Sequence, residues 1–178
     1  PNKKTLLVIG GSLGAKTVNE SILSGLEQLW AADIQLIWQT GGFYYTQIMG
    51  KMKKPWDERL RVYGFIKEMQ YAYTIADVVV SRAGALSLSE LMLSAKPSIL
   101  IPSPNVAEDH QTLNAQMLIS GKAALMVPDA LADKTLVKTA LSLLSDEEQQ
   151  QELSKNISAM GRPHAAVDIA KKVIELVA

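Results

Sequence analysis

The feature that most constrains the fold is an alternation of short apolar runs with amphipathic stretches along the 178 residues. The first run, Thr5–Ile9, ends at Gly10-Gly11 and is typical of a strand buried on both faces of a parallel sheet. The stretch that follows, residues 16–30, repeats apolar side chains at helical spacing. Because this strand-and-helix unit recurs, the sequence predicts right-handed crossovers and an α/β fold.

The expected elements follow from the same pattern. Six expected strands share apolar and β-branched residues and cover residues 5–9, 34–38, 60–63, 77–80, 98–101 and 124–127. The expected helices cover residues 16–30, 44–52, 69–75, 87–94, 108–120, 132–144 and 146–178, with a kink or break at Gly161-Arg162-Pro163. We therefore predict one Rossmann-like domain over residues 1–178, with a doubly wound, six-stranded parallel sheet. In such sheets, ligands bind beyond the carboxyl ends of the strands.

Composition excludes several classes of protein. Lysine plus arginine total 18 and aspartate plus glutamate total 18, so the chain lacks the basic excess expected of a nucleic-acid binder. There is no cysteine, which excludes disulfides, a thiolate zinc site and a cysteine nucleophile. No apolar run approaches the roughly 20 residues of a membrane span, and no secretory signal opens the chain. We expect a soluble, cytoplasmic domain, and the start at Pro1-Asn2 suggests a piece excised from a longer protein.

A glycine-rich turn, Gly10–Ala15, follows the first strand and opens the first helix. Such a turn either binds an anion through backbone N–H groups or is simply a tight connection that needs positive φ, and the local sequence leaves both open. It matches neither of two familiar nucleotide loops. Ala15 replaces the second glycine of a P-loop, and Ser12 replaces a glycine of the dinucleotide fingerprint. A diphosphate ligand remains compatible with the turn.

A second turn of small residues, Ser81–Ala85, follows the fourth strand. Ser87 and Glu90 fit the S-x-x-E capping box, and locally this hypothesis is favoured over ligand binding. A glutamate at this position could instead accept hydrogen bonds from a ribose diol. Arg82 is either a solvated surface charge or a clamp on a diphosphate, and its position at the strand end favours the clamp.

Amide side chains follow the fifth strand. His110 and Asn114 are four residues apart and Gln111 and Asn114 are three apart, so they share much of one helical face. Amides both donate and accept hydrogen bonds, which suits the hydroxyls of a sugar. For this segment alone an ordinary polar face is the favoured interpretation. No acid or serine pairs with His110 in the sequence to support a role as a general base.

Four segments occur in a fixed order with compatible spacing. They are Gly10-Gly11-Ser12-x-Gly14-Ala15, Gly64-Phe65-Ile66-x-x-Met69, Ser81-Arg82-Ala83-Gly84-Ala85-x-Ser87-x-x-Glu90 and His110-Gln111-x-x-Asn114-Ala115. Together they resemble the MurG family of bacterial peptidoglycan glycosyltransferases, which are two-domain GT-B enzymes. The resemblance covers nearly the whole chain, but only the carboxyl-terminal, donor-binding half of the family.

The resemblance implies sites for a uridine nucleotide. Gly11 and Ser12 match the loop beside the donor diphosphate. Ile66 matches the residue whose backbone recognises uracil, and Phe65 and Met69 would wall that pocket.

Further matches extend this implied site along the donor. Ala85, Leu86 and Ser87 match the helix start that offers N–H groups to the phosphates, with Arg82 in the same loop. Glu90 matches the acid that holds the ribose hydroxyls, which replaces the capping-box hypothesis.

The resemblance also implies how the sugar is recognised. Gln111 matches a glutamine that contacts the sugar, and Asn114 belongs to the same motif. Many relatives carry a second glutamine where His110 stands, so His110 is assigned to the donor site by position alone.

The implied activity is transfer of N-acetylglucosamine from UDP-GlcNAc to undecaprenyl-pyrophosphoryl-MurNAc-pentapeptide (lipid I), which yields lipid II. The acceptor site, the general base and a membrane-docking patch belong to the family's other half, and no cofactor or metal is expected. The parent protein is expected at the cytoplasmic face of the inner membrane. The alternatives are another UDP-sugar GT-B enzyme (a transferase or an epimerase), a nucleotide-binding module without chemistry, and a degenerate P-loop ATPase.

Overall fold

The computed structural model describes residues 3–52, 58–104 and 109–177. Its strands are β1 (Thr5–Ile9), β2 (Gln35–Gln39), β3 (Leu60–Tyr63), β4 (Val78–Ser81), β5 (Ser98–Leu100) and β6 (Leu125–Met126). Its helices are α1 (Lys16–Ala31), α2 (Gly42–Lys51), α3 (Met69–Ile75), α4 (Ala85–Ser94), α5 (His110–Ser120), the short η2 (Asp129–Leu131), α6 (Ala132–Ser145), α7 (Glu147–Ala159) and α8 (Ala165–Val177). The alternation that the sequence predicts is therefore confirmed.

The six strands form one parallel sheet in the order β3-β2-β1-β4-β5-β6. In register, Leu7 of β1 lies between Ile37 of β2 and Val79 of β4. The strand order runs outward in both directions from β1 and β4, so the switch point of the topology lies between these two strands. A crevice forms at the carboxyl ends of the strands at such a point, which is where a ligand is expected.

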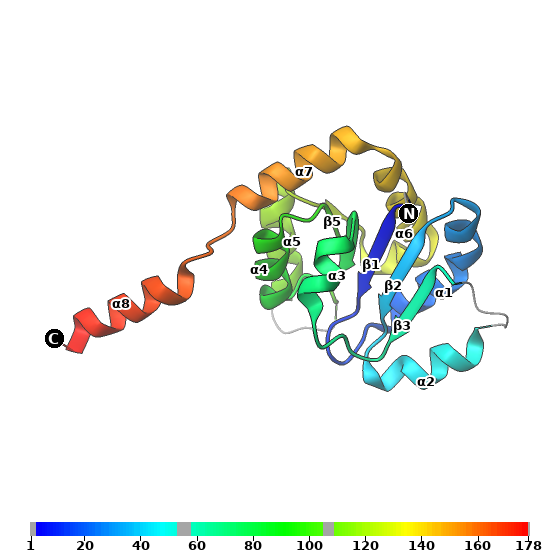
Figure 1. The fold of residues 1–178 in the computed structure, drawn as a ribbon, viewed down its shortest axis with the longest axis horizontal. Coiled ribbons are helices and arrows are strands. Elements are labelled where there is room, and N and C mark those ends of the chain that lie inside the picture. The colour runs from blue at the N-terminus through cyan, green and yellow to red at the C-terminus, as the bar shows by residue number, and fades with distance from the viewer. Residues whose placement is uncertain (1–2, 53–57, 105–108, 178) are drawn as a thin grey trace.

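Helices cover both faces of the sheet, as Figure 1 shows. Leu6 and Val8 pack in one core with residues of α1 and α6, whereas Leu7 and Ile9 pack in the other with residues of α3, α4 and α5. Successive side chains of a strand point to opposite faces, so a strand covered on both sides must be apolar throughout. Burying one such leucine contributes about 1.5–3 kcal/mol relative to leaving it exposed.

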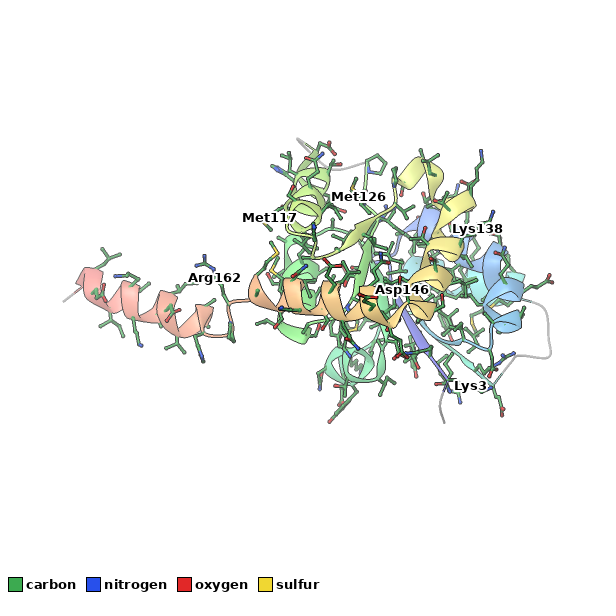
Figure 2. All side chains as sticks on the ribbon, turned by 90° about the horizontal axis from the view of Figure 1, so that it is seen from above. Lys3, Met117, Met126, Lys138, Asp146 and Arg162 are labelled. Atoms are coloured by element: carbon green, nitrogen blue, oxygen red, sulfur yellow. The ribbon has the colours of Figure 1, made fainter. Side chains whose placement is uncertain are left out.

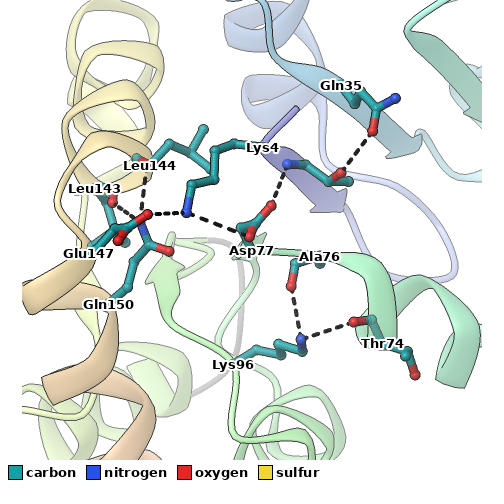
Figure 3. A network of polar contacts seen from close by, with 11 residues as sticks. Lys4, Gln35, Thr74, Ala76, Asp77, Lys96, Leu143, Leu144, Glu147 and Gln150 are labelled. Atoms are coloured by element: carbon teal, nitrogen blue, oxygen red, sulfur yellow. Dashed lines mark hydrogen bonds and ion pairs between the residues drawn. The ribbon is translucent and has the colours of Figure 1, made fainter. Parts of the chain in front are cut away.

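The amino-terminal edge of the sheet carries a network of polar contacts (Figure 3). Asp77 Oδ2 accepts a 2.6 Å hydrogen bond from the backbone N–H of Thr5. Lys96 donates to the carbonyl oxygens of Thr74 and Ala76 at 3.3 and 2.9 Å, and so satisfies the end of α3. Burial lowers the pKa of Lys96, although the nearby charge of Asp77 opposes this. These contacts fix α3 on the sheet from the edge opposite the crevice.

The last helix, α8, extends away from the rest of the molecule (Figures 1 and 2). The predicted break at Gly161-Arg162-Pro163 is confirmed, because α7 ends at Ala159 and α8 begins at Ala165. Large apolar side chains of α8 are exposed, including Ile169 at 65% and Ile174 at 64%. Over the described part of the chain, α8 and the other helices are too short or too polar to traverse a bilayer.

Several elements differ from those that the sequence predicts, mostly by one or two residues at their ends. α4 begins at Ala85, two residues before Ser87, because Gly84 rather than a serine is its N-cap. The turn η2, which starts at Asp129, was not predicted. The helix expected from residue 108 begins at His110, and residues 105–108 lie outside the described residues.

Candidate functional site

The glycine-rich turn joins β1 to α1 at the carboxyl edge of the sheet. Gly11 and Gly14 have φ values of 81° and 87°, which lie in the left-handed region that favours glycine. A Cβ atom at Gly14 would overlap the carbonyl oxygen of Thr40, so this turn packs directly on the turn after β2. Gly41 of that second turn has a φ of 83°, and a Cβ atom at Gly41 would likewise overlap the backbone of Gly14. The two hypotheses for the glycine-rich turn are therefore compatible. One side of the turn packs tightly on the turn after β2, and the other side faces solvent.

A buried asparagine holds these two turns together. Asn19 Nδ2 donates a 2.9 Å hydrogen bond to the carbonyl oxygen of Thr40, and Trp38 Nε1 donates a 3.0 Å hydrogen bond to Asn19 Oδ1. Asn19 is 1% exposed. Its only signal in the sequence is a polar residue next to Val18 on the apolar face of α1. The amino end of α1 is thereby fixed against β2.

A crevice of about 370 Å³ lies where the segments after β1, β4 and β5 meet. It brings together five of the predicted site residues: Gly11, Ser12, Arg82, Ser87 and Gln111. Both α1 and α4 begin at this crevice. The N–H groups in the first turn of a helix have no acceptor within the helix, and the helix dipole is positive there. Two helix ends therefore make this crevice favourable for an anion.

The capping-box hypothesis for Ser87 and Glu90 is wrong. The N-cap of α4 is Gly84, and no side chain makes a capping hydrogen bond at that end. Ser87 lies inside the first helical turn and lines the crevice. Leu86 beside it is 83% exposed, so the start of α4 is open to solvent. Glu90 is free of the helix end and available to a different partner.

That partner is Tyr73, in the wall of a second cavity of about 720 Å³ between α3 and α4. The hydroxyl of Tyr73 donates a 2.9 Å hydrogen bond to Glu90 Oε2. Burial, and to a lesser extent the charge of Glu90, raises the pKa of Tyr73, so this hydroxyl keeps its proton and remains the donor. Met69 lines the same cavity. Within the described part of the chain, Oε2 is the Glu90 carboxylate oxygen that receives a hydrogen bond, which leaves Oε1 for a ligand.

Gln39, at the end of β2, links the glycine-rich turn after β1 to the segment after β3. Its Oε1 accepts a 2.8 Å hydrogen bond from the backbone N–H of Ile66, and its Nε2 donates to the carbonyl oxygen of Gly11 at 3.4 Å. Gln39 is 2% exposed. Phe65, next to Ile66, is 60% exposed and lines neither cavity. In the sequence, Gln39 stands where a dinucleotide-binding fold would need an acid for the ribose. Its bridging role depends on contacts that no local motif shows.

The amides of α5 anchor this helix to the neighbouring segments. Gln111 Oε1 accepts a 2.9 Å hydrogen bond from the backbone N–H of Ser103, and Asn114 Nδ2 donates a 3.1 Å hydrogen bond to the carbonyl oxygen of Ala83. Gln111 lines the crevice, whereas Asn114 and the exposed His110 are outside its lining. The amide face that the sequence predicts is thus divided between the crevice and structural contacts.

The guanidinium group of Arg82 is held by the chain itself. Its Nη1 donates to the carbonyl oxygens of Ile101 and Pro102 at 3.1 and 3.2 Å, and to Asp129 Oδ1 at 2.5 Å. The side chain is only 13% exposed, so the interpretation as a solvated surface charge is wrong. Asp129, which no sequence motif marks, balances the charge of Arg82.

The geometry gives little support to a P-loop ATPase. Asp77, the acid nearest to β4, lies before that strand and accepts a hydrogen bond from Thr5, at the edge opposite the glycine-rich turn. It is therefore remote from where a P-loop enzyme holds Mg²⁺. Among residues 3–52, 58–104 and 109–177, there is no group of three or more histidine, aspartate or glutamate side chains that could hold a metal ion.

A family model and the sequences of known proteins both relate the chain to glycosyltransferases. Residues 5–172 match the model of the glycosyltransferase family 28 C-terminal domain. The chain is 52% identical over 177 residues to a UDP-N-acetylglucosamine–N-acetylmuramyl-(pentapeptide) pyrophosphoryl-undecaprenol N-acetylglucosamine transferase from Cytophaga hutchinsonii, covering 99% of this chain and 47% of that protein. The chain thus spans about half the length of such relatives.

Solved structures share the fold. The crystal structure of MurG from Acinetobacter baumannii superposes with a TM-score of 0.86 at 26% identity, covering 98% of this chain and 51% of that one. A structure of MnaA from S. aureus with UDP superposes with a TM-score of 0.74, covering 99% of this chain and 47% of that one. Its identity of 11% makes it a likeness of fold alone.

Proposed function

The chain belongs to glycosyltransferase family 28, as a C-terminal domain of that family, and from this premise we propose that it binds the sugar donor of an inverting transferase. The proposed donor is UDP-GlcNAc. The proposed acceptor is the C4 hydroxyl of lipid I, and the product is lipid II. Relatives that carry this activity in their names and share about half of this chain's residues support the proposal.

The observation that carries the proposal is the meeting of two helix amino-termini at one crevice, next to a cavity that contains a carboxylate. Gly11 and Ser12 would contact the diphosphate from one side, and the N–H groups of Ala85, Leu86 and Ser87 from the other. Backbone dipoles can bind an anion in a chain whose net charge is zero, because they do not enter the count of charges. Arg82 borders the same crevice.

The cavity between α3 and α4 would hold the nucleoside. Glu90, oriented by Tyr73, would accept hydrogen bonds from the ribose hydroxyls through its free oxygen. Met69 would be an apolar wall of this cavity. Ile66 would recognise uracil through its backbone, and Phe65 would cover the base only where the ligand extends beyond the cavity, because neither residue lines it. Because the N–H of Ile66 is bonded to Gln39 here, its carbonyl oxygen is the group left for the base.

The sugar would lie against the start of α5. Gln111 Oε1 is bonded to Ser103, so its NH₂ group is the part left to donate to a sugar hydroxyl. Asn114 would act indirectly, since it holds α5 to the carbonyl oxygen of Ala83. His110, the first residue of α5, would border the sugar from the exposed side.

The chemistry follows from this placement. The acceptor hydroxyl would attack the anomeric carbon from the face opposite UDP, and the bond from that carbon to the diphosphate oxygen would break with its electrons moving to the oxygen. The proton of the hydroxyl would go to a base outside this chain. The helix ends at the crevice would stabilise the negative charge that grows on the departing UDP, because they are fixed in place before the reaction.

The remainder of the parent protein would supply the acceptor site, the base and the contact with the membrane at its cytoplasmic face. The exposed apolar residues of α8, such as Val173 and Leu176, support this division, because an isolated surface of this kind is normally covered by another part of a protein. We therefore propose that residues 1–178 are one donor-binding domain, which on its own binds the donor and transfers nothing.

A titration with two epimeric donors tests the proposed substrate. The chain should bind UDP-GlcNAc more tightly than UDP-GalNAc, and Gln111→Ala should reduce the difference. Gln116→Ala, an exposed position on the same helix, is the matched control and should leave it unchanged. Equal binding of both sugars by the unchanged chain would contradict recognition of the sugar by α5.

A further inference from the structure

Asp129 joins three segments at the carboxyl edge of the sheet. It follows β6 as the first residue of η2, and its side chain is 16% exposed. Its Oδ1 accepts from Arg82 Nη1, and its Oδ2 accepts a 3.0 Å hydrogen bond from Thr17 Oγ1 in the first turn of α1. Both carboxylate oxygens are therefore occupied by groups of the chain. Asp129 also borders an apolar cavity of about 410 Å³, and Arg82 and Thr17 border the crevice, so this ion pair lies between two cavities.

The hydrogen bonds of Arg82 leave part of its guanidinium group unused. Nη1 makes all of the hydrogen bonds that Arg82 has with the described residues, to Asp129 and to the carbonyl oxygens of Ile101 and Pro102. Guanidinium is a rigid planar fork, so fixing one nitrogen fixes the direction of the remaining N–H groups. Those groups are left for an acceptor in the crevice, which Arg82 lines. A bidentate contact to a phosphate needs this kind of fixed fork.

We propose that Asp129 is a positioning residue for Arg82, which aims the guanidinium at the crevice and sets the net charge that a bound diphosphate meets. This rests on the proposed function, because it assigns the crevice to a diphosphate. For a ligand group that does not touch Arg82, the carboxylate of Asp129 cancels most of the charge of Arg82. Binding of the diphosphate then depends on the helix ends and on the direction of the fork, and release of UDP is not opposed by a full positive charge.

Substitution of Asp129 separates its charge from its geometry. Asn at this position keeps an oxygen that can accept from Arg82 and gains an NH₂ group that can donate to Thr17 Oγ1, but it removes the negative charge. Ala removes the charge and both contacts. Asp133→Asn is the matched control, because Asp133 is an exposed acid four residues further along the chain and its loss changes the net charge equally.

The experiment is calorimetric titration of the 178-residue chain and its variants with UDP, uridine and inorganic pyrophosphate, at low and high salt. Asp129→Asn should bind UDP and pyrophosphate about three- to tenfold more tightly, from the Coulomb energy of one added charge near a dianion. Uridine binding should not change, and the gain should shrink as salt increases. Asp129→Ala should bind UDP more weakly than Asp129→Asn, because the side chain at position 129 no longer fixes the direction of the Arg82 guanidinium group. Asp133→Asn should behave as the unchanged chain.

Each other result decides against the proposal. If Asp129→Asn binds pyrophosphate no more tightly than the unchanged chain, Asp129 does not set the charge of the crevice. If Asp129→Ala equals Asp129→Asn, it does not aim Arg82. Pyrophosphate keeps this test separate from the proposed function. A chain that binds pyrophosphate but prefers ATP to UDP would contradict the uridine donor, and the effect of Asp129 would still be measured.

Discussion

The hydroxyl of Tyr73 lies 2.9 Å from Glu90 Oε2 and joins α3 to α4 across the wall of the larger cavity. Tyr73 is 6% exposed, so its ring is fixed by packing, and Lys96 holds the end of the same helix through the carbonyl oxygens of Thr74 and Ala76. The carboxylate of Glu90 is therefore oriented by a hydrogen bond from a neighbouring helix and not by capping of its own helix.

Removal of this hydroxyl should weaken recognition of ribose. Tyr73→Phe should reduce the affinity for UDP about three- to tenfold, the net effect of one ordinary hydrogen bond, because the lost bond acts on the ribose only through Glu90. A 2′,3′-dideoxy analogue of UDP should bind both chains equally, since it lacks the diol. Tyr71→Phe is the control, because Tyr71 lies in the same helix and is 63% exposed. An equal loss of affinity for both ligands would show that the bond acts on something other than the ribose.

The same pair predicts a dependence of stability on pH. Burial and Glu90 raise the pKa of Tyr73 above its ordinary value of 10.0. A raised folded-state pKa contributes stability that is fully present below the unfolded pKa and is lost as pH rises above it. The free energy of unfolding should therefore fall above pH 10, by up to about 1.4 kcal/mol per pH unit. Denaturant titrations between pH 9 and about 11 should show that the free energy of unfolding falls less steeply with pH in Tyr73→Phe than in the unchanged chain. Identical slopes in the two chains would refute this assignment.

The contact between the two glycine turns should limit substitution at Gly14. Gly14→Ala combines a φ of 87° with an overlap onto the carbonyl oxygen of Thr40. We expect a loss of about 2–4 kcal/mol in the free energy of unfolding. Gly50→Ala in α2 meets nothing within 4 Å and should be neutral or stabilising. A Gly14→Ala chain as stable as the parent would show that the turns do not depend on this contact.

Asn19 should stabilise the two turns of the site through its buried hydrogen bonds. Asn19→Ala leaves Trp38 Nε1 and the carbonyl oxygen of Thr40 without their partner in a buried region. Each unsatisfied group costs about 1–3 kcal/mol, which thermal or chemical unfolding would measure. Asn156→Ala removes an amide from an exposed bond to Lys122 and should cost far less. Equal losses in the two variants would contradict the structural role of Asn19.

The fold could be predicted because its signals are local. A strand covered on both faces must be apolar, as Leu6–Ile9 shows, and the break before α8 is marked by Gly161 and Pro163 themselves. The site could be predicted in part. Gly11, Ser12, Arg82, Ser87 and Gln111 do meet at one crevice, but this convergence follows from the order of the strands.

The remaining site features depend on contacts distant in sequence. In the sequence, Glu90 fits a capping box with Ser87. In the structure, α4 starts earlier, and the Glu90 carboxylate accepts a hydrogen bond from Tyr73, which is 17 residues away. Asp129 is separated from Arg82 by 47 residues. No local pattern distinguishes such partners from ordinary polar residues, because the packing of the folded chain brings them together.

Calorimetric titration of the 178-residue chain with UDP and with ATP distinguishes a uridine site from a general phosphate site, since both nucleotides offer phosphates to the crevice but differ in their base. We expect that UDP binds, that ATP binds much more weakly, and that Glu90→Ala reduces the affinity for UDP. Tighter binding of ATP than of UDP, or UDP binding that survives Glu90→Ala unchanged, would contradict this expectation.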